Sequence, residues 1–151
     1  MVIDTPPALN FYSMSALIAA ESVLIPFDCD AFSAQAVDQV LATITEVRAD
    51  HAPSLALEGV IINHFQPQTK QALQWIQELE KKGIPLLQPY LSQAIAMKES
   101  HAVGKPLVYS HPKHKLTQQF IELANSLIQT KKRKNSSQRK PQRNELPHDS
   151  F

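Results

Sequence analysis

Residues 22–50, SVLIPFDCDAFSAQAVDQVLATITEVRAD, decide the fold class. The first seven of them include the β-branched Val23 and Ile25 and the aromatic Phe27, which favours a buried strand that ends at Asp28. From residue 31 the apolar side chains recur three and four positions apart, which is the spacing of one helix face. Ser33 is a candidate for the residue that caps the start of this helix. The stretch therefore predicts a strand followed by an amphipathic helix, whose apolar face holds Val37, Val40, Leu41, Ile44 and Val47.

The same alternation continues along the chain. LEGVIINHF (57–65) and IPLLQPYL (84–91) are two further apolar strands. PQTKQALQWIQELEKKG (67–83) and HPKHKLTQQFIELANSLIQT (111–130) have the apolar spacing of helices. Strands that are apolar throughout, and not at every second position, are typical of parallel sheets covered on both faces. We predict an α/β domain over residues 1–130, with a parallel sheet and helices on both faces.

The first ten residues, MVIDTPPALN, suggest another strand end. Val2, Ile3 and Asp4 have the character of a buried strand, and two prolines stop it because proline lacks a backbone N–H and fixes φ. Asp4 would then lie at the carboxyl end of a strand, where open α/β sheets bind their ligands. The simpler alternative is that an aspartate before two prolines is a turn residue.

Composition excludes several classes of protein. With 151 residues and 43% hydrophobic content, the chain can bury one sizeable core. Cys29 is the one cysteine, so an internal disulfide is excluded and a reducing compartment is compatible. No apolar run approaches the roughly 20 residues of a membrane span, and no basic region precedes an apolar stretch at the start. We expect a cytoplasmic protein without a membrane partner.

Four segments, taken in order, resemble a known family. They are VIDTPP (2–7), ALIAAESVLIPFDCDAFSAQAVDQVLATI (16–44), EGVIINHF (58–65) and QPYLSQAIAMKESHAVGKPL (88–107). Together they resemble the C-terminal part of a ParA/MinD-type partition ATPase, a deviant Walker P-loop NTPase, and the likeness extends from residue 1 to about residue 128. The resemblance implies a P-loop NTPase-like fold and a role in plasmid or chromosome partitioning.

The resemblance also implies roles for three residues, with ATP and Mg²⁺ as the family's cofactors. Asp4 matches the Walker B aspartate, which holds Mg²⁺ through water, as suits a hard cation that keeps several waters. Asn63 and Pro89 match positions on the adenine side of the nucleotide; an amide can both donate to and accept from a base edge. For Asn63 the alternative is a hydrogen bond to its own loop. Tyr90, which follows Pro89, departs from the polar residue that is usual in the family.

The family's phosphate-binding loop has no counterpart here. That loop is rich in glycine and carries a lysine, and its backbone N–H groups face the phosphates. The three glycines, Gly59, Gly83 and Gly104, are too far apart to form one. We therefore expect Met1 to fall inside an ancestral ATPase, and the chain alone to hydrolyse no ATP. Three hypotheses stay open: a truncated or mis-started ATPase, a non-catalytic binding module that pairs with an intact homologue or lies on DNA, and a gene remnant without function. A second copy of the chain is a further candidate partner.

The charge distribution separates the end of the chain from its body. Residues 1–130 hold eight Lys/Arg and twelve Asp/Glu, whereas residues 131–151 hold seven Lys/Arg and two Asp/Glu. The tail is poor in apolar residues, so we predict that residues 131–151 form a disordered basic tail. Such a tail is either simply solvated or binds DNA without sequence preference by neutralising phosphates. The candidate DNA-binding residues are Lys131, Lys132, Arg133, Lys134, Arg139, Lys140 and Arg143.

Overall fold

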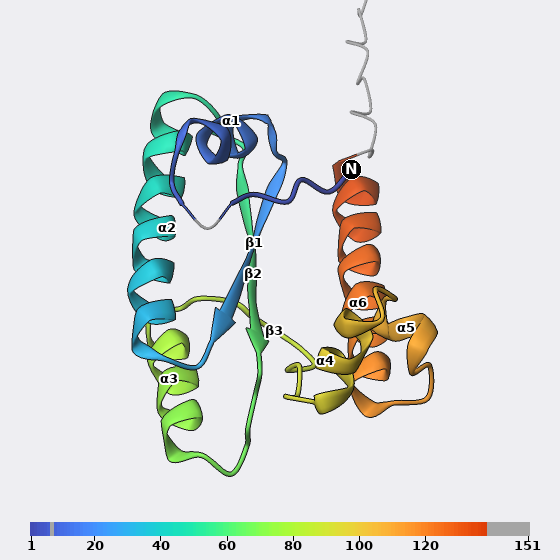
Figure 1. Cartoon of the computed structure of the whole chain (residues 1–151). Helices are drawn as coiled ribbons and strands as arrows, with labels where there is room; N and C mark the ends of the chain where they lie inside the picture. Colours follow the sequence, from blue (N-terminus) through green and yellow to red (C-terminus); the bar gives the residue numbers. More distant parts are fainter. Residues whose placement is uncertain (7, 139–151) are drawn as a thin grey trace, which may run out of the picture.

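A computed structural model of the chain describes residues 1–6 and 8–138. Helices and strands alternate along most of this length, as the sequence predicts, and Figure 1 shows them coloured along the chain. The elements are α1 (Phe11–Ala19), β1 (Ser22–Asp28), α2 (Ala31–Asp50), β2 (Ala56–Asn63), α3 (Lys70–Lys81), β3 (Leu86–Leu87), α4 (Ile95–Ala102), α5 (Leu107–Ser110) and α6 (Lys115–Gln138).

The strands form one parallel sheet in the order β1-β2-β3. β1 and β2 pair along their whole length, with a register shift after Val23, whereas β3 pairs over two residues only. β3 is short because Pro85 and Pro89 flank it and neither can donate to a ladder. At Gly59, on β2, φ is +152°, and a Cβ there would lie 2.9 Å from both Leu87 Cγ and the Pro85 carbonyl oxygen. Glycine therefore lets β3 approach β2 closely.

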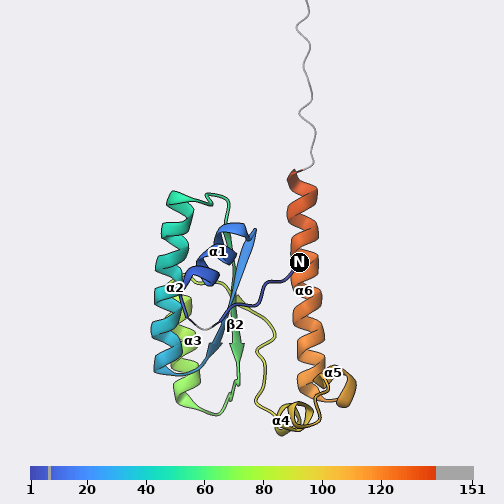
Figure 2. The same ribbon diagram turned by 45° about the horizontal axis from the view of Figure 1, so that its top comes forward.

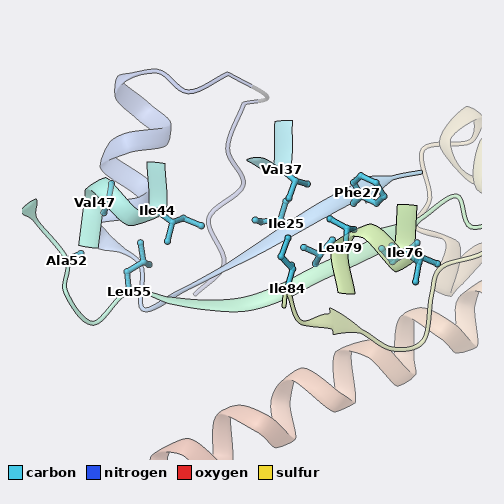
Figure 3. Packing of buried hydrophobic residues seen from close by; sticks show 12 residues of the cluster. Ile25, Phe27, Val37, Ile44, Val47, Ala52, Leu55, Ile76, Leu79 and Ile84 are labelled. Carbon is cyan, nitrogen blue, oxygen red and sulfur yellow. The ribbon is translucent and has the colours of Figure 1, made fainter. Parts of the chain in front are cut away.

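The larger core lies between the sheet and α1, α2 and α3; we call it the sheet core. Figure 3 shows side chains of β1, α2 and α3 turned toward one another across this layer. Phe27, Val60 and Ile62 are completely buried there, and Val37 and Val47 of α2 nearly so. The complete set is Ile25, Phe27, Val37, Ile44, Val47, Ala52, Leu55, Val60, Ile62, Ile76, Leu79 and Ile84.

The opposite side of the sheet carries a smaller unit, which we call the cap, formed by α4, α5 and α6. In Figures 1 and 2, α6 stands on the other side of the sheet from α2 and α3, with α4 and α5 at its N-terminal end. Helices thus cover both faces of a parallel sheet, which confirms the predicted fold class. The cap has its own core, against which Ile61 and Leu87 of the sheet pack; the cap core consists of Leu91, Ala96, Leu107, Leu116 and Leu123.

The expected strand at Val2 and Ile3 is absent from the described residues. Residues 1–6 belong to no strand, and Val2 is 96% exposed. They run from the side of α6 across to the sheet in both views (Figures 1 and 2). The prediction was wrong because strand character alone does not make a strand; its N–H and C=O groups need a neighbouring ladder. Asp4 is therefore exposed and does not lie at a strand end.

Two local predictions also need correction. Asp30, not Ser33, caps α2: its carboxylate accepts from the Ser33 N–H at 2.7 Å. Leu73, expected on the apolar stripe of α3, is 46% exposed. α6 extends to Gln138, so its last turns include the first residues of the predicted tail. The rest of the predicted tail, residues 139–151, lies outside the described residues.

Candidate nucleotide-binding groove

A groove of about 1180 Å³ opens at the carboxyl edge of the sheet. The loop that follows β2, the loop that follows β3 and the starts of α4 and α6 line it. Ligands of open α/β sheets bind in this position, just beyond the carboxyl ends of the strands. Among the lining residues the sequence singled out Pro89 and its neighbour Tyr90. The structure adds His64, Phe65, Lys98, His101, His114 and Lys115.

The groove wall between the two loops is held together by short-range contacts. Phe65 and Tyr90 meet edge to face, with ring centroids 5.1 Å apart. The Phe65 N–H donates to the Leu91 carbonyl at 2.8 Å, and the Leu91 N–H donates to the Ile62 carbonyl at 2.9 Å. Burial raises the pKa of the Tyr90 phenol, and the Glu80 carboxylate raises it further, so Tyr90 is neutral at physiological pH. The loop before Tyr90 contains a cis peptide bond between Gln88 and Pro89.

At the mouth of the groove the ends of β1 and β2 are linked through one histidine. His64 Nδ1 lies 3.1 Å from Asp28 Oδ2 and 3.4 Å from Asn63 Nδ2. His64 has φ of +48°, an unusual conformation for a residue other than glycine, which directs the chain sharply after β2. Asn63 is half-buried and lies next to the groove residue His64, but it does not itself line the groove.

The chemistry of the lining favours an anionic or hydrogen-bonding ligand. Lys98 and Lys115 line the groove, and of its described lining residues none is Asp or Glu. α4 and α6 begin here, without an acidic residue in either first turn, so backbone N–H groups add to the positive potential. Glutamines 66, 68, 88, 93 and 119 supply amides that donate and accept.

The other candidate residues lie elsewhere. Asp4 is outside the groove lining, and within residues 1–6 and 8–138 no three His, Cys, Asp or Glu side chains converge as metal ligands would. Lys131, Lys132, Arg133 and Lys134 belong to the last turns of α6. Arg139, Lys140 and Arg143 lie outside the described residues. Every helix in the described part of the chain is too short or too polar to span a bilayer.

Solved structures with the same fold include nucleotide-binding proteins. Cobyrinic acid a,c-diamide synthase from Mycobacterium smegmatis, with bound ADP and magnesium, superposes with a TM-score of 0.68 at 23% identity; the match covers 85% of this chain and 46% of that one. Apo McdA from Cyanthece gives a TM-score of 0.70 at 18% identity, over 83% of this chain and 51% of that one. These likenesses define a P-loop NTPase-like α/β domain.

Sequence comparison finds relatives of one kind. A family model described as an AAA domain matches residues 1–57. The chromosome partitioning protein ParA of Myxococcus xanthus is 28% identical over 131 residues, which are 85% of this chain and 46% of that protein. The sporulation initiation inhibitor protein Soj of Bacillus subtilis is 26% identical over 82% of this chain and 49% of that protein.

In sequence the chain resembles the ParA/MinD-type partition ATPases and matches their C-terminal part. It spans about half the length of the curated relatives that it matches.

Proposed function

We propose that this chain is the base-binding part of a ParA-like partition ATPase and that it does not hydrolyse ATP by itself. The observation that carries the proposal is the groove at the carboxyl edge of the sheet, with Pro89 in its lining and Asn63 next to the lining residue His64. Asp4 would bind Mg²⁺ only in a complete ATPase, because its exposed segment is not held at a strand end here. The proposed location is the cytoplasm.

The groove suits the base better than the phosphates. Phe65 and Tyr90 offer aromatic surface, and the glutamine amides can pair with a base edge. Phosphates would meet two lysines and two helix starts, but no glycine-rich loop, since the three glycines are scattered along the sequence. Adenosine and ATP should therefore bind with affinities that differ by less than about tenfold, which corresponds to about 1.4 kcal/mol.

Titration of the purified chain with adenosine, ADP and ATP, followed by chemical shifts of its amides, tests this proposal. We expect the shifts to concentrate around residues 63–66 and 88–98 and to be independent of Mg²⁺. Asn63→Ala should weaken binding, whereas Asn125→Ala, on the exposed side of α6, should not. If adenosine leaves those amides unmoved while ATP binds tightly only with Mg²⁺, the phosphates and not the base direct binding.

DNA is the second candidate ligand, and the distribution of charge favours it. Residues 84–121, which contain α4, α5 and the start of α6, hold four lysines and one glutamate. Residues 1–83 hold four Lys/Arg and ten Asp/Glu. The cap and the seven cationic residues that follow residue 130 would thus form the surface that approaches DNA phosphates. A DNA-bound form could also include a second copy or an intact homologue.

A salt titration of binding to duplex DNA tests this second candidate. Changing Lys131, Lys132, Arg133 and Lys134 to Gln should make the slope of log K against log salt shallower by about 0.9 for each contact that is lost, up to about 3.6. Lys70→Gln with Lys81→Gln, on α3 of the acidic half, is the matched control and should leave the slope unchanged. Equal slopes for all three proteins would exclude a DNA contact at residues 131–134.

A further inference from the structure

The loop between β3 and α4, residues 88–94, carries two of the residues that line the groove, Pro89 and Tyr90. An isolated bridge pairs Ser92 of this loop with Phe65 of the loop after β2. A segment without helix or ladder keeps one conformation only where its polar groups find partners outside it. The place of Pro89 and Tyr90 in the groove therefore depends on the contacts that hold this loop.

Two successive backbone N–H groups of the loop are bound from opposite sides, as the alternation of an extended segment allows. The Leu91 N–H donates to the Ile62 carbonyl of β2 at 2.9 Å. The Ser92 N–H donates to Gln119 Oε1 of α6 at 3.0 Å. The sheet thus holds the loop through its backbone, and the cap holds it through the side chain of Gln119.

The turn of α6 that carries Gln119 is itself firmly anchored. Leu116 and Thr117 are buried, and the Thr117 hydroxyl donates to the His111 carbonyl at 2.7 Å. Gln119 is half-buried in the groove lining. A glutamine loses rotamer freedom when it is fixed, and an anchored backbone beneath it reduces what the loop contact must still order. The Gln119 amide is therefore suited to transmit the position of α6 to the loop.

The neighbouring glutamine makes a contact of another kind. Gln118 is exposed, and its Nε2 donates to the Pro112 carbonyl at 2.9 Å, within the cap. Gln118 and Gln119 thus share a side-chain type and a helix turn, but one is bound to the cap itself and the other to the loop of the groove.

We propose that Gln119 is a positioning residue of the groove: by accepting from the Ser92 N–H, it holds Pro89 and Tyr90 in the conformation that receives a ligand. The inference rests on the proposed function, in which that ligand is the base of a nucleotide. Gln119 acts through its carbonyl oxygen and needs no contact with the ligand. If the loop is held for only a fraction of the time, the apparent dissociation constant rises by the inverse of that fraction.

Adenosine binding to the full chain tests the proposal, because adenosine is uncharged and reports the base without the phosphates. Gln119→Met removes the acceptor but keeps an unbranched side chain of similar helix propensity, and it should raise the dissociation constant about tenfold. Gln118→Met is the matched control and should bind adenosine like the unaltered chain. An unchanged dissociation constant in Gln119→Met would overturn the proposal.

The conservative variant Gln119→Glu separates positioning from direct contact with the base. A carboxylate still accepts from the Ser92 N–H but has no N–H of its own to donate, so adenosine binding should return to within about threefold of the unaltered chain. A Gln119→Glu variant as weak as Gln119→Met would mean that Gln119 donates to the base directly, which contradicts the positioning role.

Hydrogen exchange of the ligand-free chain separates this proposal from the proposed function. Exchange at the Leu91 and Ser92 amides should be at least about tenfold faster in Gln119→Met and unchanged in Gln118→Met. Unchanged protection at Ser92 in Gln119→Met would overturn the positioning role, whatever the affinity for adenosine. Faster exchange there, in a protein whose unaltered form does not bind adenosine, would confirm that Gln119 holds the loop and would reject the base-binding role instead.

Discussion

The sheet core and the cap core are built from the same kinds of side chain but differ in how many side chains they bury. Twelve buried residues form the sheet core, and its strands contribute three that are completely buried, Phe27, Val60 and Ile62. The cap core has five buried residues, which come from the loop after β3, from the short helices α4 and α5, and from α6. Since stability follows buried apolar area, the sheet half should carry most of the free energy of folding.

The two regions also differ in what they present to a ligand. The sheet half is acidic, whereas the cap is basic and supplies the two lysines of the groove. The cap is joined to the sheet through two-residue β3 and the hydrogen bonds around Leu91. In the proposed function, a more stable half would thus position a less stable half that faces the ligand, which is the usual arrangement for binding regions.

Of the substitutions that test this comparison, Phe27→Ala should cause the largest loss of stability. Phe27 is completely buried at the centre of the sheet core, so truncation loses its burial and leaves a cavity. We expect the free energy of unfolding to fall by about 3–5 kcal/mol. Urea denaturation followed by circular dichroism measures it. A loss below about 1 kcal/mol would show that the sheet half is not the stable one.

Leu123→Ala should destabilise the cap and spare the sheet. Leu123 is 5% exposed in the cap core, and its truncation should cost about 2–3 kcal/mol locally. Hydrogen exchange should become faster in α4 and α6, while β1 and β2 keep their protection. Uniformly faster exchange in both regions would mean that the chain unfolds as a single cooperative unit, and the distinction drawn here would not hold.

Gly59→Ala should weaken the connection between the two regions. The new Cβ would approach Leu87 Cγ and the Pro85 carbonyl oxygen at 2.9 Å, and φ of +152° is unfavourable for alanine. We expect a loss of about 1–3 kcal/mol in the free energy of unfolding and faster exchange at β3. Gly83→Ala is the control, because φ is also positive there but a Cβ would have nothing within 4 Å. Equal losses in the two variants would mean that the positive φ alone destabilises the protein and that the close contact with Leu87 and Pro85 adds nothing.

The smallest expected effect is that of the Cys29 thiol on stability at high pH. Burial raises the pKa of its thiol, and the Asp28 and Asp30 carboxylates raise it further. The folded state therefore holds the proton more tightly than the unfolded state. Its contribution to stability is complete below the ordinary thiol pKa of about 8.5 and is lost as pH rises through the higher folded value. Iodoacetamide at pH 8 should alkylate folded Cys29 more slowly than the urea-unfolded chain, and Cys29→Ser should flatten the decline of stability above pH 8.5. Equal alkylation rates would contradict this.

The sequence predicts the sheet half well and the cap poorly. β1 and α2 have the predicted bounds, because their apolar spacing is long and regular and matches what the core buries. α4 and α5 were missed because they are short and bury few side chains; α4 buries only Ala96 and Ser100. α1 was missed because Phe11, Tyr12 and Ile18 are apolar yet exposed, which hides its buried face.

The groove could be predicted only in part. Pro89 was identified through a resemblance, but His64, Lys98 and Lys115 are far apart in sequence and meet only through the fold. The prediction of a strand at Val2 and Ile3 was wrong for the opposite reason. The pattern of a strand is present there, but the neighbouring strand that it needs is not among the described residues. Sequence patterns report local preference, whereas ladders and grooves depend on which segments become neighbours.

ATP turnover by the purified chain tests the central proposal most directly, namely that this chain is the base-binding part of a ParA-like ATPase and does not catalyse hydrolysis alone. With Mg²⁺ and saturating ATP, phosphate release should equal the background of a matched Asp4→Ala preparation, since no glycine-rich loop holds the phosphates. Turnover well above background that disappears on Asp4→Ala would contradict the claim. It would show that the chain holds phosphates and Mg²⁺ by residues that the account does not assign.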